Sequence, residues 1–165
     1  MVDITPLLSE NVKKHFLTLP ASHQKEWVSY INEAKKEETR LKRVLKMQLS
    51  FCEKYTLEGE LQVINLLEQL RSVSSQEGNA LAEAFISAIG NNHSGVYCVA
   101  YKWAIAFLVQ LYQNSEPSSL RAIAIYGILN DLYYFEPIEE QAVNADNATI
   151  KEEIKQLLAP FADKN

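Results

Sequence analysis

The sequence is poor in residues that turn a chain sharply, because its 165 residues include only five glycines and five prolines. Runs rich in Val, Ile and Thr with period-two alternation are also missing, which leaves little support for strands. Since 47% of the residues are hydrophobic, the chain can nevertheless bury a substantial core. Together these features predict an all-α protein.

The sequence also contains only two cysteines and three histidines. Cys52 and Cys98 have no CxxC spacing, and both stand in apolar, helix-like surroundings. His15, His23 and His93 are scattered and have no His, Asp or Glu at i+3 or i+4 in an arrangement that would build a metal face. We therefore expect no disulfide framework, no metal site and no cofactor.

Long apolar runs are missing as well. The N-terminal residues have no apolar stretch of signal-peptide length, and the longest apolar segment, 96–112, is interrupted by Lys102 and Gln110. A buried helix fits that segment better than a bilayer span. We expect a cytoplasmic protein that does not enter the membrane.

Charge is present but unevenly divided. Residues 1–54 contain ten Lys/Arg and seven Asp/Glu, a net charge of +3, whereas residues 55–165 contain six and fourteen, a net charge of −8. The two values sum to the −5 of the whole chain. This division predicts a basic N-terminal helical module, 1–54, followed by an acidic helical module, 55–165.

The N-terminal module reads as a helical hairpin that follows a short helix capped by Ser9. In the first arm, Trp27, Tyr30, Ile31 and Ala34 are spaced at i, i+3, i+4 and i+7, with Ser22 as the expected N-cap. The second arm is expected over residues 37–54. Its inner stripe contains Leu41, Val44, Leu45, Gln48, Leu49 and Cys52.

The acidic module is expected to hold five more helices, which makes about eight in all. Their start signals are a capping box at Ser74 and Glu77, a proline at 117 and a second capping box at Thr149 and Glu152. The segment GNNHSG, 90–95, is expected to be a tight turn between helices. The expected ranges are about 57–73, 76–90, 96–113, 117–134 and 149–158.

The spacing of these helices leaves two architectures open. From Gln76 to Pro117 the interval is close to 41 residues, near the two-helix period of HEAT-type repeats. Only two copies are visible and their residues match poorly. The module is therefore either a HEAT-like stack or an irregular, non-repeating helical bundle.

A family resemblance covers residues 19–48. This stretch resembles the C-terminal helical segment of the YdeI/OmpD-associated family, also described as bacteriocin-protection proteins. In that family the segment follows a separate N-terminal domain for which this chain leaves no room, so we expect none of the activity that resides there. The matching residues are Leu19, Pro20, Ser22, His23, Trp27, Ile31, Ala34, Lys35, Glu38, Thr39, Arg40 and Arg43.

A second resemblance covers residues 84–137. The stretch NNHSGVYCVAYKWAIAFLVQLYQ resembles a helical-repeat segment of immunity-type proteins, in which a His-Gln-Gly-x-x-Tyr turn precedes a long apolar helix. Here Ser94 stands in place of the Gln, Tyr97 follows Gly95 after one residue instead of two, and Ala106 stands in place of the Pro in the Pro-Phe-Leu that ends that helix. The resemblance implies paired helices more than it implies a function. The matching residues are His93, Gly95, Tyr97, Ala104, Phe107 and Leu108.

Catalytic motifs are missing. The sequence has no Walker loop, no GxGxxG after a strand, no GxSxG elbow and no HExxH. Cys98 and His93 could imitate a nucleophile and its base, but five residues across a turn do not aim one side chain at the other. We therefore expect that the protein is not an enzyme.

Two charged clusters are candidate binding surfaces. A basic run could neutralise the phosphates of a nucleic acid, although interleaved glutamates also fit a solvated helix face. This run comprises Lys35, Lys36, Arg40, Lys42, Arg43 and Lys46.

The second cluster is acidic and contains aromatic residues. Aromatic anchors surrounded by charge of one sign suit a surface that meets a basic protein, although a solvated loop beside core aromatics would give the same pattern. Its residues are Asp131, Tyr133, Tyr134, Glu136, Glu139, Glu140 and Asp146. The hypothesis is a non-enzymatic protein-binding module of the immunity or antitoxin type that masks a basic toxin or nuclease. The alternative is a nucleic-acid-associated regulator that binds through residues 35–46.

Overall fold

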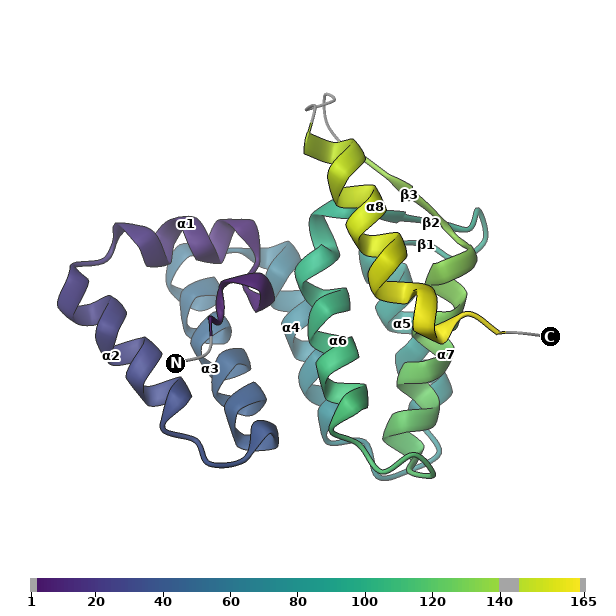
Figure 1. Ribbon diagram of the computed structural model, residues 1–165, viewed down its shortest axis with the longest axis horizontal. Coiled ribbons are helices and arrows are strands. Elements are labelled where there is room, and N and C mark those ends of the chain that lie inside the picture. The colour runs from purple at the N-terminus through teal and green to yellow at the C-terminus, as the bar shows by residue number, and fades with distance from the viewer. Residues whose placement is uncertain (1–2, 140–145, 164–165) are drawn as a thin grey trace.

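The computed structural model describes residues 3–139 and 146–163, and within them the protein is mainly α-helical, as predicted (Figure 1). Eight α-helices and one small sheet make up the described part of the chain. The helices are α1 (Glu10–Thr18), α2 (Ala21–Asn32), α3 (Glu37–Tyr55), α4 (Glu58–Arg71), α5 (Gly78–Ile89), α6 (Lys102–Gln113), α7 (Leu120–Tyr134) and α8 (Asp146–Leu158). The strands are β1 (Gly90–Asn91), β2 (Val96–Cys98) and β3 (Glu136–Ile138), and short 3-10 turns lie at Thr5–Leu7, Val99–Tyr101 and Ala159–Phe161.

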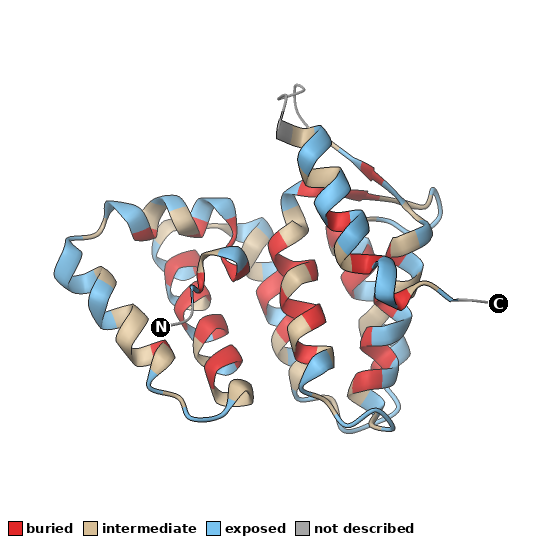
Figure 2. Cartoon of the chain, in the orientation of Figure 1, coloured by how far each residue is buried: buried red, intermediate tan, exposed pale blue. Residues whose placement is uncertain are grey.

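One continuous hydrophobic core runs through the molecule, from Ile4 near the N-terminus to Phe161 near the C-terminus. α3 packs against α4, and α7 packs most extensively against α5. Figure 2 shows the buried residues concentrated on α3 and on α4 to α7, whereas α2 is mostly half-buried or exposed. The elements of the predicted N-terminal module therefore share this core with the rest of the chain.

Two polar bridges connect elements that are distant in the sequence: one joins the N-terminal segment to α3, and the other joins α7 to α3 and α4. Gln48 of α3 is fully buried, accepts a hydrogen bond from the Ser9 backbone N–H at 3.0 Å and donates one to the Leu7 carbonyl at 2.9 Å. Arg121 of α7 donates to both carboxylate oxygens of Glu38 at 2.8 and 3.0 Å and to the Arg71 carbonyl at 2.9 Å.

The segment expected to be a tight turn between helices is a β-hairpin. β1 pairs antiparallel with β2, and β2 pairs in parallel with β3. The strands approach so closely that a Cβ added to Gly90 would lie 2.2 Å from the Val96 carbonyl oxygen, which requires a glycine there. Gly95 adopts a φ of 65°, and the Asn91 side chain accepts hydrogen bonds from the backbone N–H groups of His93 and Ser94.

The HEAT-like stack gains no support, and the irregular bundle describes the structure better. β1 and β2 lie between α5 and α6, and β3 lies between α7 and α8. Strands therefore interrupt the series of helix pairs that a HEAT-like stack would have. The helix expected from position 96 begins at Lys102 because the preceding residues form β2 and a 3-10 turn.

Several helix starts also differ from the predicted ones. Pro20 precedes α2, so the predicted cap Ser22 lies inside the helix. α7 begins at Leu120 instead of Pro117, because the Ser119 hydroxyl accepts the Ala122 N–H at 3.1 Å.

Neither predicted capping box forms. α5 begins at Gly78 after Glu77, whose side chain makes no capping hydrogen bond, so Ser74 lies in the preceding turn. α8 begins at Asp146, which places Thr149 within its first turn instead of at its cap.

Candidate functional site

α2 is held to the protein by a narrow contact. Ile31 is the buried residue of this twelve-residue helix, and α3 is its main neighbour. Trp27 and Tyr30, expected on the inner stripe with Ile31, are only half-buried. α2 therefore presents an aromatic face that α3 covers in part.

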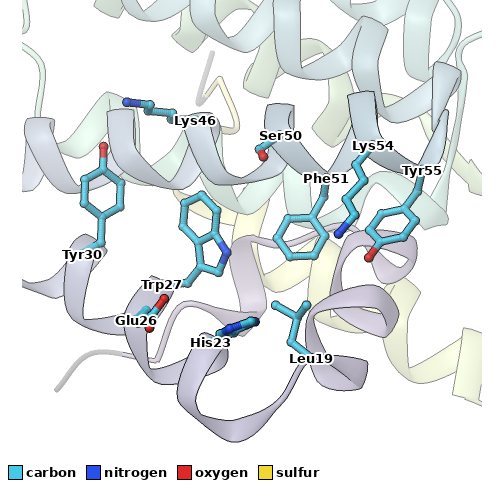
Figure 3. Close-up of a pocket in the computed structure, with 10 residues that line it drawn as sticks. All are labelled: Leu19, His23, Glu26, Trp27, Tyr30, Lys46, Ser50, Phe51, Lys54 and Tyr55. Atoms are coloured by element: carbon cyan, nitrogen blue, oxygen red, sulfur yellow. The ribbon is translucent and has the colours of Figure 1, made fainter.

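A groove with a cavity volume of about 540 Å³ lies between α2 and α3 (Figure 3). Its apolar lining comes from both helices and from the α1–α2 corner, and the ring centroids of Trp27 and Phe51 stand 6.2 Å apart across it. Phe51 and Tyr55 follow one another along α3, with 6.0 Å between their ring centroids. The lining residues are Leu19, His23, Glu26, Trp27, Tyr30, Lys46, Ser50, Phe51, Lys54 and Tyr55.

The end of the groove nearest α1 is fixed from behind, where Figure 3 shows Leu19 and Tyr55 on the same side. His15 of α1 stacks on Tyr55 with ring centroids 3.7 Å apart and planes inclined by 7°. At the α1–α2 corner, the Gln24 amide donates to the carbonyls of Leu17 and Leu19 at 3.2 and 2.9 Å. The groove therefore has a supported wall on α3 and a supported corner at Leu19.

Cations line the α3 side of the groove. Lys46 Nζ lies 5.8 Å from the Tyr30 ring centroid, and Lys54 Nζ lies 5.3 Å from that of Tyr55. Arg43 stands 4.7 Å from the Tyr30 centroid and donates to the Tyr30 carbonyl at 2.6 Å. Cations over aromatic faces add to the attraction that an anionic ligand would feel here, and they disfavour a cationic one.

The structure splits the predicted basic run. Arg40 is buried and donates from Nε to the Glu37 carboxylate at 2.9 Å and from Nη2 to the Gln110 amide oxygen at 3.1 Å. Arg43 covers Tyr30, as described above. The remaining members, Lys35, Lys36, Lys42 and Lys46, are exposed. Arg40 therefore stabilises the fold and is not available to a nucleic acid.

The predicted acidic cluster is partly neutralised by α8. Glu139 is 13% exposed and pairs with Lys151 at 3.5 Å, while Lys155 lies 4.2 Å from the Tyr133 ring centroid and donates to its carbonyl. Glu140 lies outside the described residues, as does the Asp146 side chain.

Three members of the acidic cluster remain on the surface. Asp131, Tyr134 and Glu136 are exposed, Tyr134 by 61%. Partial desolvation raises the pKa of Asp131 above its ordinary value. Among its described members, this surface is therefore smaller and less acidic than the sequence suggested.

Reactive chemistry has little support among residues 3–139 and 146–163. No group of three or more His, Cys, Asp or Glu side chains that could hold a metal ion occurs there. Burial raises the pKa of the Cys52 thiol to about 12, which keeps it protonated. Cys98 is buried, whereas His93 is exposed in the β1–β2 turn. No described helix is long and apolar enough to cross a membrane.

Comparison with known families supports the resemblance of the N-terminal region. A family model described as "OmdA: Bacteriocin-protection, YdeI or OmpD-Associated" matches residues 6–48. The match begins before the stretch first recognised, 19–48, and it covers 43 of 165 residues, about a quarter of the chain. It includes α1, α2 and the first part of α3, and therefore most of the groove. No curated protein and no solved structure matches the chain significantly.

Sequence reasoning missed the groove although it identified part of its lining. Trp27 and Tyr30 were assigned to the hydrophobic stripe because their spacing is that of a helix face turned to a core. The available signal was their number, since Phe51 and Tyr55 add two more aromatic rings on a second helix that faces the first. Phe51 is buried, but a short hairpin arm has too little neighbouring structure to bury the other three rings as well.

Proposed function

We propose that the protein is a non-enzymatic protein-binding module of the bacteriocin-protection type, and that it holds its partner in the α2–α3 groove. The observation that carries this proposal is the aromatic, partly uncovered groove, six of whose ten lining residues lie in the segment 6–48 that is similar to that family. Partly buried aromatic side chains in a concave site are the usual energetic centre of a protein interface.

A protection assay tests this function. Susceptible bacteria expressing the chain are challenged with a panel of purified bacteriocins, both nuclease and pore-forming, and survival is compared with that of cells carrying an empty vector. We expect protection against at least one member, together with a complex in size-exclusion chromatography. Trp27→Ala should abolish both.

Leu17→Ala is the matched control, because Leu17 is 56% exposed on α1 and does not line the groove. It should leave protection intact. Absence of any protection and of any complex across the panel would refute the proposed function. Equal loss in the Trp27 and Leu17 variants would refute the assignment to the groove.

The exposed acidic surface is a second candidate contact, for a basic partner. Asp131 and Tyr134 at the end of α7 and Glu136 at the start of β3 supply charge and an aromatic side chain. Changing Glu136, Glu139 and Glu140 together to Lys should weaken the binding of a basic partner and reduce the salt dependence of that binding. Unchanged affinity and unchanged salt dependence would remove this surface from consideration.

The nucleic-acid alternative rests on the exposed lysines 35, 36, 42 and 46. It predicts retention on DNA or RNA that weakens steeply with salt and is lost when these four are changed to Ala. Arg40 and Arg43 are left unchanged in this test because both stabilise α3 and its neighbours. Retention that survives the substitutions would refute this alternative.

A further inference from the structure

The two walls of the groove carry different charges. On α3, Lys46 and Lys54 are exposed and line the groove, and each lies near an aromatic ring. On α2 the charged lining residue is Glu26, and Figure 3 shows it on the opposite side from Lys46. An occupant therefore meets positive charge along one edge and negative charge along the other.

The lysines also have a defined separation. They are eight residues apart on one helix, which at 1.5 Å per residue corresponds to roughly 12 Å along the axis. Two side chains on one face of a partner helix repeat at the same interval when they are seven or eight residues apart. The aromatic rings of Phe51 and Tyr55 lie in the same stretch of α3.

The partial burial of α2 indicates which kind of segment the groove would accept. α2 has an aromatic face without full cover, and α3 already packs with its other side on α4. A third helix laid along the groove would cover Trp27 and Tyr30 in the way that a helix fills a hydrophobic groove, with anchors at i, i+4 and i+7. A helix pairs most of its backbone groups internally, whereas an extended segment would have to pair its backbone groups with water here, because neither wall of the groove is a strand.

We propose that the occupant of the groove is an amphipathic helix of the partner protein. It has an apolar stripe that packs on Trp27 and Phe51, and two acidic side chains about two turns apart that face Lys46 and Lys54. This inference rests on the proposed function and specifies the chemistry of the partner. The lysines select the partner and its direction, and the aromatic rings supply most of the affinity.

A selection experiment tests this chemistry on the full chain. A displayed library of 18-residue helix-forming peptides, randomised along one apolar stripe and at the positions beside it, is selected on the wild-type protein. We expect enrichment of Asp or Glu at two positions seven or eight residues apart on one side of the stripe. The enriched peptides should lose binding to the Trp27→Ala variant.

Charge reversal provides the matched comparison. In the double variant Lys46→Glu, Lys54→Glu, the affinity of an enriched acidic peptide should fall by about tenfold or more, and the same peptide with Lys in place of its two acids should bind better than it does to the wild type. The control is Lys35→Glu, Lys36→Glu, which changes the net charge equally at exposed positions that do not line the groove. Circular dichroism and thermal melting establish that each variant is folded.

The possible failures separate the two levels of the proposal. Peptides that require Trp27 but show no acidic preference would leave the groove as the binding site and overturn the acidic helix. Peptides that bind the Trp27→Ala variant as well as the wild type, or a selection without enrichment, would overturn the groove itself. Equal weakening by both charge-reversed variants would reduce the effect to overall charge and would also overturn the inference.

Discussion

Replacement of Gln48 by Leu should destabilise the protein strongly, although a leucine at that position would extend the hydrophobic stripe of α3. The amide is fully buried and bridges two backbone groups, the Ser9 N–H and the Leu7 carbonyl. Leucine leaves both without a partner, at about 1–3 kcal/mol for each buried unsatisfied group. Part of this cost is offset because an apolar side chain is easier to bury.

The net loss should be about 3 kcal/mol in the free energy of unfolding, measured by urea denaturation. For a chain of this size it corresponds to a fall in Tm of roughly 6–12 °C. Gln48→Glu adds a pH signature. A protonated carboxyl can donate to the Leu7 carbonyl whereas a carboxylate cannot, so that variant should be less destabilised at pH 4 than at pH 7 when each is compared with the wild type.

The control is Ser9→Ala. This substitution removes the hydroxyl that accepts the Val12 N–H at 3.1 Å but keeps the backbone N–H that Gln48 binds, so it should cost only about 1 kcal/mol. A cost below about 1 kcal/mol for Gln48→Leu, or equal costs for the two variants, would refute the view that this amide joins the N-terminal segment to α3.

Three further predictions concern other sites. Arg121→Met should lower the free energy of unfolding by about 2–4 kcal/mol, because it leaves Glu38 and two backbone carbonyls without their donor. Lys102→Met breaks an exposed ion pair with Glu153 and should lower it by less than about 1 kcal/mol in the same urea denaturation assay. Equal losses in the two variants would contradict this ranking. Cys52 should react with a thiol reagent at pH 8 only after the protein is unfolded, and rapid labelling of the native protein, located by mass spectrometry, would contradict its burial. The raised pKa of Asp131 means that its ionised carboxylate destabilises the folded state. Asp131→Asn should therefore stabilise the protein at pH 7, and progressively less as the pH falls toward 3. A gain in stability that does not depend on pH would exclude desolvation of the carboxylate as its cause.

The helices could be predicted from the sequence because their apolar residues recur with the helical period. All eight expected helices exist, and Gln48 lies on the inner side of α3 where its spacing placed it. The three strands could not be found in this way. They are two or three residues long, and their pairing depends on the close approach of Gly90 to Val96, which no local pattern reveals.

The candidate site was harder to predict because side-chain environment depends on tertiary packing. Arg40 belonged to an apparently solvated basic run, yet Glu37 and Gln110 hold it in the interior. Glu139 belonged to an acidic surface, yet Lys151 of α8 lies against it. In both cases the partner comes from another turn or another helix, so net charge along the chain overestimated the charge available on the surface.

The limited burial of α2 has a consequence for how the protein moves. Ile31 is the one fully buried residue of α2, and Trp27, Val28 and Tyr30 pack on the core only in part. We therefore expect the free energy that holds α2 in place to be a small part of the total, and we expect this helix to detach while α3 and the core remain folded. Backbone amides of α2 should therefore exchange with solvent through a local opening, and those of α3 only through global unfolding. A ligand that joins the two helices would slow exchange selectively in α2, so a hydrogen-exchange map can reveal a natural partner even when its binding leaves the rest of the molecule unchanged.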